Sequence, residues 1–391
     1  MLDRVNMGDA QGVTHALESL ERALDALHAD AQCEVFQRRT QRISVDLEQG
    51  RVCVRQGVEE GTAVRLRARG VVHFGAASGI DREAAREART MARALPGTNT
   101  PDADLPWAGP GRLLDVEGTS PLPPAAAMEG WLRRAARDAR ASLDAAVAVE
   151  TLGSGGGLRT CRMRSIVWGR RLEGTQMRSA VGRRLEQLDP GDWEEPERIE
   201  GDPLALPRGG DMALLPAAVG ALAPSLVAAV PPGAAAGPGW SCVDDPEDPD
   251  APSAGPFDDT GFPAERLRLA GGGRVLAAAR GPGRRRRHSF REPPVERAAN
   301  LTFLSSGSWT GHGVLARAAR IQAVGPDWWV VLDAARAEKG HPVGPWRERI
   351  VRGRPEAWVA SCEAVLPPHR RTPEGVLTGT LVFSTHRGLR V

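Results

Sequence analysis

Two adjacent aspartates are the first residues in this sequence that suggest chemistry. Asp258 and Asp259 lie in segment 255–263, which also contains Phe257 and Gly261. Paired carboxylates can act as general acid and base, or can hold a cation between their oxygens. Alternatively, the two side chains accept hydrogen bonds from backbone amides in a tight turn, in which Gly261 takes a positive φ. The sequence favours the turn.

A run of arginines is the strongest local concentration of charge. Arg284 to Arg287 are consecutive, and Arg280, Arg291 and Arg297 flank them. Such a run can contact the phosphates of a nucleic acid, or an acidic peptide. It can also form a solvated loop, or pair with the acidic run 244–250, although exposed ion pairs contribute little stability. The sequence favours a solvated loop, so nucleic acid is not the expected partner.

The histidines and cysteines form no recognisable metal or nucleophile motif. None of the eight histidines has another three to five residues away, and the five cysteines include no CxxC pair. There is no Gly-x-Ser-x-Gly sequence. Cys242 lies in a predicted loop beside Asp244 and Asp245, whose negative charges raise the pKa of a thiol. Cys362 is predicted to be a buried structural thiol, and we expect neither a metal nor another cofactor.

The composition is that of an ordinary globular protein. Of the 391 residues, 41% are hydrophobic and 26% are charged, and the net charge is +2. This charge is too small to indicate an anionic membrane or nucleic acid as the main partner. The N-terminus has no apolar run of signal-peptide length, and Pro216 and Pro224 break the most apolar stretch, 212–230. We therefore expect a cytoplasmic protein with no membrane partner.

The N-terminal residues predict helices and an antiparallel sheet. Leucines recur every three or four residues in 11–30, which indicates an amphipathic helix. Apolar and polar residues then alternate in three runs, and Gly50, Gly61 and Gly70 are predicted turns between them. A second helix is predicted from Asp81 to about Leu95, with Ser78 or Asp81 as its N-cap. Helices on one face of an antiparallel sheet give an α+β fold.

The rest of the chain divides into a middle segment and a mainly β C-terminal part. Residues 96–124 are rich in Pro and Gly and predict a linker, followed by a helix over 125–149 and short strands after Leu158. From Ala299 onward, short apolar runs alternate with turns, including the run 358–360, and one helix is predicted over 314–324. The predicted domains are 1–100, an α/β layer domain; 101–208, a middle segment; and 209–391, a mainly β domain.

Three segments, in order along the chain, resemble the TldD/PmbA family, also called the modulator of DNA gyrase family. The first is Gly70 to Ser78, which ends the predicted meander and precedes a helix. The second is Gly-Pro-Phe-Asp-Asp-Thr-Gly-Phe-Pro at 255–263, with Gly273-Arg274-Val275-Leu276 after it, and it is the most specific. The third runs from Pro293 through Asn300 to Thr302. Together these segments cover most of residues 15–310.

The resemblance implies an N-terminal α/β layer domain, an antiparallel β domain and assembly into dimers. Family dimers often pair a zinc peptidase, whose metal lies on a helix with His-Glu-x-x-x-His, with a metal-free subunit. In the matching helix of this chain, Pro224, Ser225 and Ala229 occupy the three motif positions. None of these side chains can serve as a zinc ligand or a catalytic base. The chain is therefore similar to the metal-free, PmbA/TldE-type subunit and is not expected to be an enzyme by itself.

These comparisons of motifs define the expected function and its alternatives. The expected role is to help form a peptide chamber and to stabilise a zinc-bearing TldD-like partner, or a second copy, with peptide as the substrate. Residues of 255–263 and 280–300 are predicted to form the chamber wall. The predicted peptide or partner contacts are Phe257, Asp258, Asp259, Arg284, Arg285 and Asn300. One alternative is a divergent peptide-processing enzyme of a natural-product pathway with a relocated active site, and another is a nucleic-acid-binding module that uses the arginine run.

Overall fold

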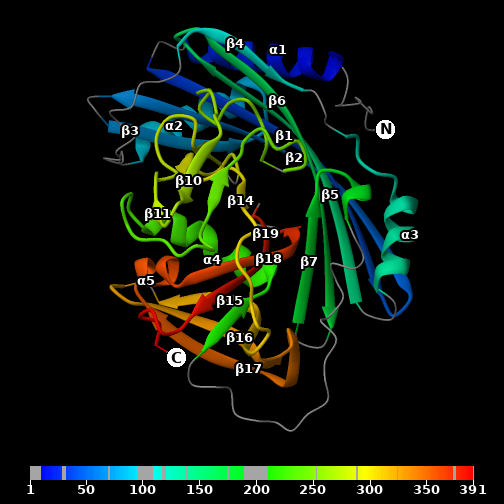
Figure 1. The fold of residues 1–391 in the computed structure, drawn as a ribbon. Coiled ribbons are helices and arrows are strands. Elements are labelled where there is room, and N and C mark those ends of the chain that lie inside the picture. Colours follow the sequence, from blue (N-terminus) through cyan, green and yellow to red (C-terminus); the bar gives the residue numbers. More distant parts are fainter. Residues whose placement is uncertain are drawn as a thin grey trace.

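Long antiparallel strands and a few short helices make up the chain in this computed structural model (Figure 1). The structure describes residues 10–28, 32–68, 71–95, 109–116, 120–136, 140–173, 176–188, 210–251, 253–287, 289–323, 325–372 and 376–390. The helices are α1 (Ala10–Leu27), α2 (Arg82–Ala94), α3 (Ala125–Ala136), α4 (Pro216–Ala229) and α5 (Pro355–Ala360), with a short 3₁₀ turn at Leu185–Gln187. The architecture confirms the predicted α+β class.

The N-terminal sheet, sheet A, has the strand order β3-β2-β1-β5-β6-β4, with β7 also paired to β6. All of its pairings are antiparallel except that of β4 with β6. Its strands are β1 (Cys33–Glu48), β2 (Arg51–Ala68), β3 (Val71–Ser78), β4 (Gly111–Asp115), β5 (Arg140–Ser154), β6 (Leu158–Glu173) and β7 (Gln176–Gly182). Sheet A thus joins strands from both sides of residue 100, and the predicted domain boundaries stay predictions.

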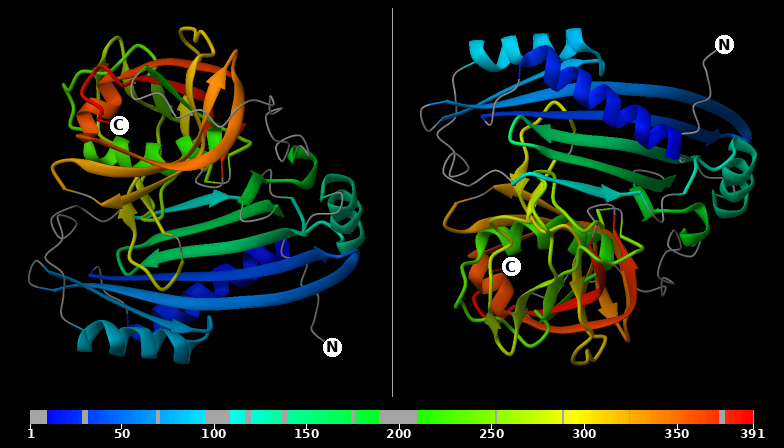
Figure 2. Two further views of the ribbon diagram at one scale, coloured as in Figure 1. Left: turned by 90° about the horizontal axis from the view of Figure 1, so that it is seen from below. Right: turned by 90° about the horizontal axis from the view of Figure 1, so that it is seen from above.

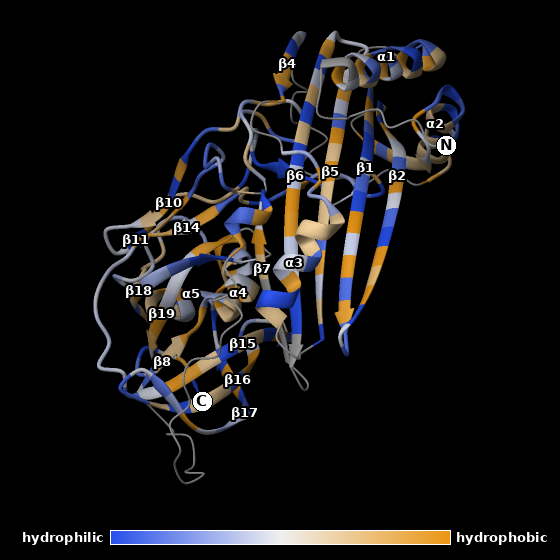
Figure 3. Cartoon of the chain, turned by 90° about the vertical axis from the view of Figure 1, so that its right-hand side faces the viewer, coloured by the Kyte–Doolittle hydropathy of each residue, from blue (hydrophilic) through white to orange (hydrophobic). Residues whose placement is uncertain are grey.

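Helices α1, α2 and α3 all pack on one face of sheet A, as predicted for the first two (Figure 2). Residues at alternate positions of β1 contact them: Val35 packs with α1 and α2, and Val45 with α3. The same alternation is visible along the strands in Figure 3. Asp81 caps α2, since its side chain accepts a hydrogen bond from the Ala84 amide at 2.8 Å. The opposite face of sheet A, called the inner face below, carries Glu34 and Phe36 and is turned toward the C-terminal domain.

The C-terminal domain is built on sheet B, whose order is β11-β10-β9-β14-β19-β8-β15-β16-β17, with β18 paired to β19. Its core lies between this sheet and helices α4 and α5 and includes Leu222, Trp358 and Phe383. A separate pair joins β12 to β13. The strands are β8 (Asp211–Leu214), β9 (Cys242–Asp244), β10 (Leu267–Gly271), β11 (Arg274–Val275), β12 (Arg285–Arg286), β13 (Val295–Glu296), β14 (Leu301–Phe303), β15 (Gly313–Ala323), β16 (Trp328–Glu338), β17 (His341–Gly353), β18 (Cys362–Arg371) and β19 (Leu377–Ser384).

Two predicted helices are wrong in part or in full. The helix predicted over 125–149 ends at Ala136, and residues 140–149 belong to β5; residues 314–323 of the other predicted helix belong to the strand β15. Most of β5 is buried on both faces, and β15 lies between β8 and β16. A strand buried on both faces, as β5 is, has a near-continuous apolar run, which periodicity cannot distinguish from a helix. Conversely, the run 358–360, predicted as a strand, belongs to α5.

The turn predicted at Gly61 is also wrong. Gly61 lies inside β2, paired with Arg38 on one side and Ser78 on the other. A Cβ atom at this position would lie 2.2 Å from the ring of Phe290. Glycine is therefore required here because the Phe290 ring lies against this position, and not because the chain turns. Gly50 does form the β1–β2 turn, with φ of 75°, and Gly70 lies outside the described residues.

Among the described residues, no helix combines the length and apolar character needed to cross a membrane.

Candidate functional site

The predicted site segments meet sheet A at a buried cluster of arginines and carboxylates. The turn at 256–263 and the arginine run lie against the inner face of the sheet, where Arg162 of β6 donates to the Phe257 carbonyl oxygen at 3.0 Å. The Arg162 guanidinium also lies 5.4 Å from the centre of the Phe257 ring. We call this set the interdomain cluster; its members are Glu34, Glu150, Arg162, Arg164, Phe257, Asp258, Asp259, Arg285, Arg286 and Arg287.

Asp258 closes the turn that the sequence favoured. Its Oδ1 accepts hydrogen bonds from the amide and the hydroxyl of Thr260, each at 2.8 Å, and from the Phe262 amide at 3.1 Å. Gly261 has φ of 81°. Asp258 Oδ2 accepts from the Arg285 amide at 3.2 Å. Asp258 therefore shapes the loop and ties it to the arginine run.

Asp259 bridges the two domains. Its Oδ1 accepts from Arg162 and, at 2.8 Å, from Arg164, while Oδ2 accepts from the Arg287 amide. Burial alone would raise the pKa of Asp259, but the guanidinium groups of Arg162 and Arg164 hold this pKa well below its ordinary value. The carboxylate therefore stays ionised, and its low pKa and three hydrogen-bond donors make it a poor general base near neutral pH.

Glu150 completes the ion network on β5. It accepts from Arg162 Nη2 at 2.9 Å and lies 3.4 Å from Arg164 Nε. Burial favours the neutral acid, yet Arg164 and Arg162 hold the pKa of Glu150 below its ordinary value. Each arginine is thus shared between Glu150 of sheet A and Asp259 of the C-terminal domain. Buried ion pairs whose charges all have partners fix the relative positions of the segments that carry them.

The arginine run is buried, so the prediction of a solvated loop is wrong. Arg286 is only 1% exposed, and Arg287 pairs with Glu34 at 3.3 Å and lies 4.5 Å from the centre of the Phe36 ring. Burial lowers the pKa of Arg286 and of Arg287 to about 10, with Asp259 and Glu34, respectively, partly opposing the change. Buried in this way, the run presents no surface to nucleic-acid phosphates. The partner of Arg287 lies far away in sequence, on sheet A, and that of Arg284 lies on β9.

Arg284 and Asn300 belong to a second buried group inside the C-terminal domain. Arg284 pairs with Asp244 at 3.2 Å, which is the internal pairing with the acidic run considered above. The amide of Asn300 donates to Asp244 at 2.9 Å, and its side chain donates to the Asp245 carbonyl oxygen at 2.9 Å. The structure therefore brings Phe257, Asp258, Asp259 and Arg285 together and places Arg284 and Asn300 beside β9.

Several members of the interdomain cluster were missed in the sequence. Arg162 and Arg164 fell within a segment assigned to short strands, and Glu150 came directly after the predicted helix. One signal was available: Arg162 and Arg164 alternate with the buried Met163, as expected for a strand with one polar face. No local pattern connects these residues to Asp259, about one hundred positions away.

The cluster has no room for a substrate. The space beside Phe257, Asp259 and Glu150 has a volume of about 10 Å³, enough for about one water molecule. Arg162 and Arg164 bind Glu150 and Asp259, and Arg287 binds Glu34, so the arrangement is suited to holding two domains together. We therefore interpret the interdomain cluster as a structural lock that sets the position of the C-terminal domain against sheet A.

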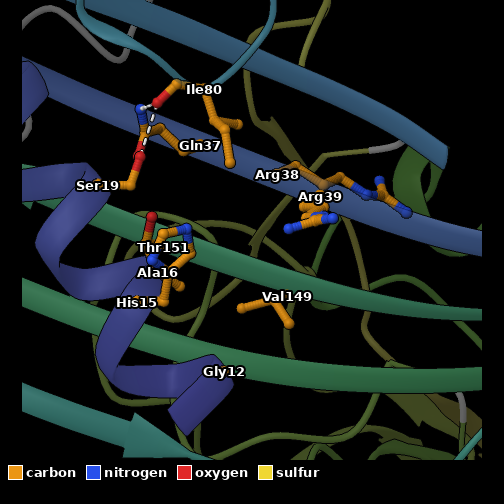
Figure 4. Close-up of a pocket in the computed structure, with 10 residues that line it drawn as sticks. All are labelled: Gly12, His15, Ala16, Ser19, Gln37, Arg38, Arg39, Ile80, Val149 and Thr151. Carbon is orange, nitrogen blue, oxygen red and sulfur yellow. Dashed lines mark hydrogen bonds between the residues drawn. The ribbon is translucent and has the colours of Figure 1, made fainter. Parts of the chain in front are cut away.

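A small pocket lies on the opposite face of sheet A, between α1 and strands β1 and β5 (Figure 4). Ser19 and Gln37 both donate to the Ile80 carbonyl oxygen, at 2.6 and 2.9 Å. The Gln37 Oε1 atom is buried without a hydrogen-bond partner. Because the Ser19 proton is engaged with Ile80, Ser19 and His15 do not form a nucleophile–base pair. The volume of about 30 Å³ suits a water molecule.

Three solved structures share this architecture over nearly the whole chain. TldE from Thermococcus kodakarensis superposes with a TM-score of 0.68 at 12% identity, covering 94% of this chain and 98% of its own. A putative modulator of DNA gyrase from Bacteroides thetaiotaomicron superposes with a TM-score of 0.66 at 14% identity, covering 97% of this chain and 98% of its own. A putative modulator of DNA gyrase from Thermotoga maritima superposes with a TM-score of 0.63 at 12% identity, covering 96% of this chain and 99% of its own. The chain has the TldD/PmbA fold. No family model matches the sequence, and no curated protein matches it.

Within the TldD/PmbA fold, the three positions compared with the zinc motif lie on the solvent side of α4. Pro224 is half-buried, and Ser225 and Ala229 are exposed. A pyrrolidine ring, a hydroxyl and a methyl group do not fit the donor set that zinc requires. Across the described ranges, histidines, cysteines, aspartates and glutamates form no group of three that could hold a metal ion.

The thiols of this TldD/PmbA-fold chain are mostly buried. Cys242 lies in β9 and not in the predicted loop, and burial, with a smaller effect of Asp244, raises its pKa to about 12. Cys362 is fully buried, as predicted, and burial raises its pKa well above the ordinary value. Neither thiol is therefore an activated nucleophile. Cys53 is exposed.

The lowered pKa of Asp259 predicts a specific response to acid. In the unfolded chain an aspartate titrates at about 3.9, and a carboxylate with a lower pKa in the folded state stabilises the fold above that pH. This stabilisation is lost as the pH falls from about 4 toward the pKa of the folded state. We expect urea unfolding midpoints to fall below about pH 4, and to fall less steeply in Asp259→Asn. Equal slopes for both proteins contradict the assigned ion pairs.

Proposed function

We propose that this chain is a non-catalytic, metal-free subunit of a TldD/PmbA-type peptidase complex. The observation that carries the proposal is the combination of a TldE-like fold over 94% of the chain with proline, serine and alanine at the compared motif positions of α4. The subunit helps to form a cytoplasmic peptide chamber and stabilises a zinc-bearing partner. Catalysis belongs to the partner in this scheme.

The position of the interdomain cluster supports a role of this chain in shaping a peptide chamber. It fixes the C-terminal domain over one half of the inner face, near Phe36 and Arg162. The inner face of sheet A continues beyond the interdomain cluster. There the Arg42 guanidinium lies 4.9 Å from the centre of the Trp168 ring and pairs with Asp144 at 2.6 Å. Arg42 is exposed and Trp168 is half-buried. We assign peptide contact to this open half, and a shaping role to the buried Phe257 and Asp259.

The test uses the purified chain and a separately expressed TldD-like subunit. The chain alone is expected to bind no stoichiometric zinc and to cleave no peptide, whereas its addition raises the thermal midpoint of the partner and its peptidase rate. Trp168→Ala is expected to lower the rate of the complex on extended peptides and to leave partner binding intact; Trp329→Ala, on β16, is the matched control. About one zinc per isolated chain, or no effect on the partner, would overturn the proposal.

A further inference from the structure

A cavity of about 270 Å³ lies on the helix-bearing face of sheet A, beside the first turn of α3, and we call it the α3 cavity. Its floor is formed by four residues of β5 and β6, in which Ala145 pairs with Val167 and Val147 pairs with Ser165. All four are buried. An apolar cavity of about 150 Å³ accommodates benzene, so the α3 cavity has room for a molecule of about eight to ten carbon atoms.

The walls of the α3 cavity are mainly apolar. Pro121, Leu122 and Pro123 form one side, and Ala127 of α3 lies on another. Leu122 is half-buried and packs against the group of buried side chains that includes Val147. Walls of this kind favour the hydrocarbon part of a ligand over water.

The polar groups around the α3 cavity are mainly hydrogen-bond donors. Ser165 is 3% exposed, and its hydroxyl oxygen accepts from the Ser120 amide at 3.3 Å. No acceptor for the Ser165 hydroxyl proton lies among the described residues. Arg183 and Arg184 line the outer side of the cavity, and Glu186, which is exposed, is the single acid among the described residues that line it.

The two arginines differ in the partners that they already have. Arg183 is half-buried and donates to the Pro249 carbonyl oxygen at 2.9 Å. Burial lowers the pKa of Arg183, and the negative charge of Asp115 partly opposes this change. Arg184 is exposed, and none of the described carboxylates forms an ion pair with it. Arg184 is therefore the cation that is available to a ligand.

These donors select the head group of the ligand. A carboxylate accepts hydrogen bonds without donating any, which suits the Ser165 hydroxyl and a guanidinium. Pro124 and Ala127 of the first turn of α3 also line the cavity, and the N-terminal end of a helix favours an anion. One available guanidinium matches a single negative charge.

We propose that the α3 cavity binds a small monocarboxylate with an apolar body of about eight carbon atoms, whose carboxylate pairs with Arg184. The hydrocarbon lies on Ala145, Val147 and Val167 and is covered by Leu122. The proposal goes beyond the proposed function, because it requires neither a zinc-bearing partner nor a peptide.

The segment that carries Arg184 also contacts the C-terminal domain. In the 3₁₀ turn that follows it, Gln187 donates to Asp250 at 2.6 Å. A carboxylate held by Arg184 is therefore expected to slow hydrogen exchange of residues 185–187. Unchanged exchange of these residues in chain saturated with octanoate would place the ligand elsewhere and overturn the proposal.

Titration calorimetry of the full chain tests the ligand class. We expect saturable binding of one octanoate per chain and no detectable binding of acetate, which lacks the hydrocarbon. The neutral 1-octanol is expected to bind at least about tenfold more weakly than octanoate, because it lacks the charge. Failure of octanoate to bind overturns the site, and equal binding of 1-octanol overturns the role of Arg184.

Two pairs of variants at exposed positions locate the bound octanoate. Ala127→Phe places a ring in the cavity and is expected to abolish binding, whereas Ala126→Phe, one residue earlier and outside the lining, is the control. Arg184→Gln is expected to weaken octanoate binding at least about tenfold, and Arg134→Gln, on the exposed side of α3, to leave it unchanged. Thermal midpoints verify that each variant is folded. Equal effects within either pair overturn the proposal.

Discussion

Replacing Asp259 by alanine is expected to lower the free energy of unfolding by about 3–5 kcal/mol, because it leaves buried guanidinium charge without its carboxylate. Arg162 and Arg164 both donate to Asp259, and each is also shared with Glu150. Urea unfolding measures the loss. Hydrogen exchange of the 257–263 turn and of β6 is expected to increase together, because both segments lose the same link.

The control for Asp259 is an ion pair on the surface. Glu348 pairs with Arg320 at 2.9 Å, and both side chains are largely exposed. Glu348→Ala is expected to change stability by no more than about 0.5 kcal/mol. Similar effects at the two positions would mean that the interdomain cluster does not hold the domains together.

Phe290→Ala is the second substitution with a large expected effect, about 3–5 kcal/mol, since it removes a buried aromatic ring. The ring is 2% exposed and packs with Phe36, Leu152 and Leu158 on the inner face of sheet A. It also covers Gly61, at which any Cβ would lie 2.2 Å from the ring. Denaturant unfolding of the single variant measures the cost.

The close approach at Gly61 provides a coupled test. Gly61→Ala alone is expected to destabilise the protein because Phe290 must move, but the same change in a Phe290→Ala background is expected to be nearly neutral. The expected coupling energy is on the order of 1–3 kcal/mol in a double-mutant cycle. Strictly additive effects would show that the ring does not occupy the space above Gly61.

The elements that were predicted correctly carry local signals. The leucine spacing of α1 and the Asp81 cap of α2 are such signals, and apolar and polar residues alternate over 43–48 of β1. β5, by contrast, is buried on both faces along most of its length, so its apolar run carries no period that separates strand from helix. β15 is held between β8 and β16 by backbone pairing.

The candidate site could be predicted only in part for a similar reason. The Asp258 turn is encoded by residues within five positions of one another, and its form was predicted. Burial of Arg287 depends on Glu34, which is 253 positions away in the sequence. A charge run whose partners lie in another domain has the same local sequence as a solvated loop.

The most direct test of the central claim is native mass spectrometry of this chain co-purified with a TldD-like subunit from its host. We predict a complex that contains both chains and, after gas-phase dissociation, zinc only on the partner. Zinc retained on this chain at about one ion per molecule, or the absence of any such complex, would contradict the account.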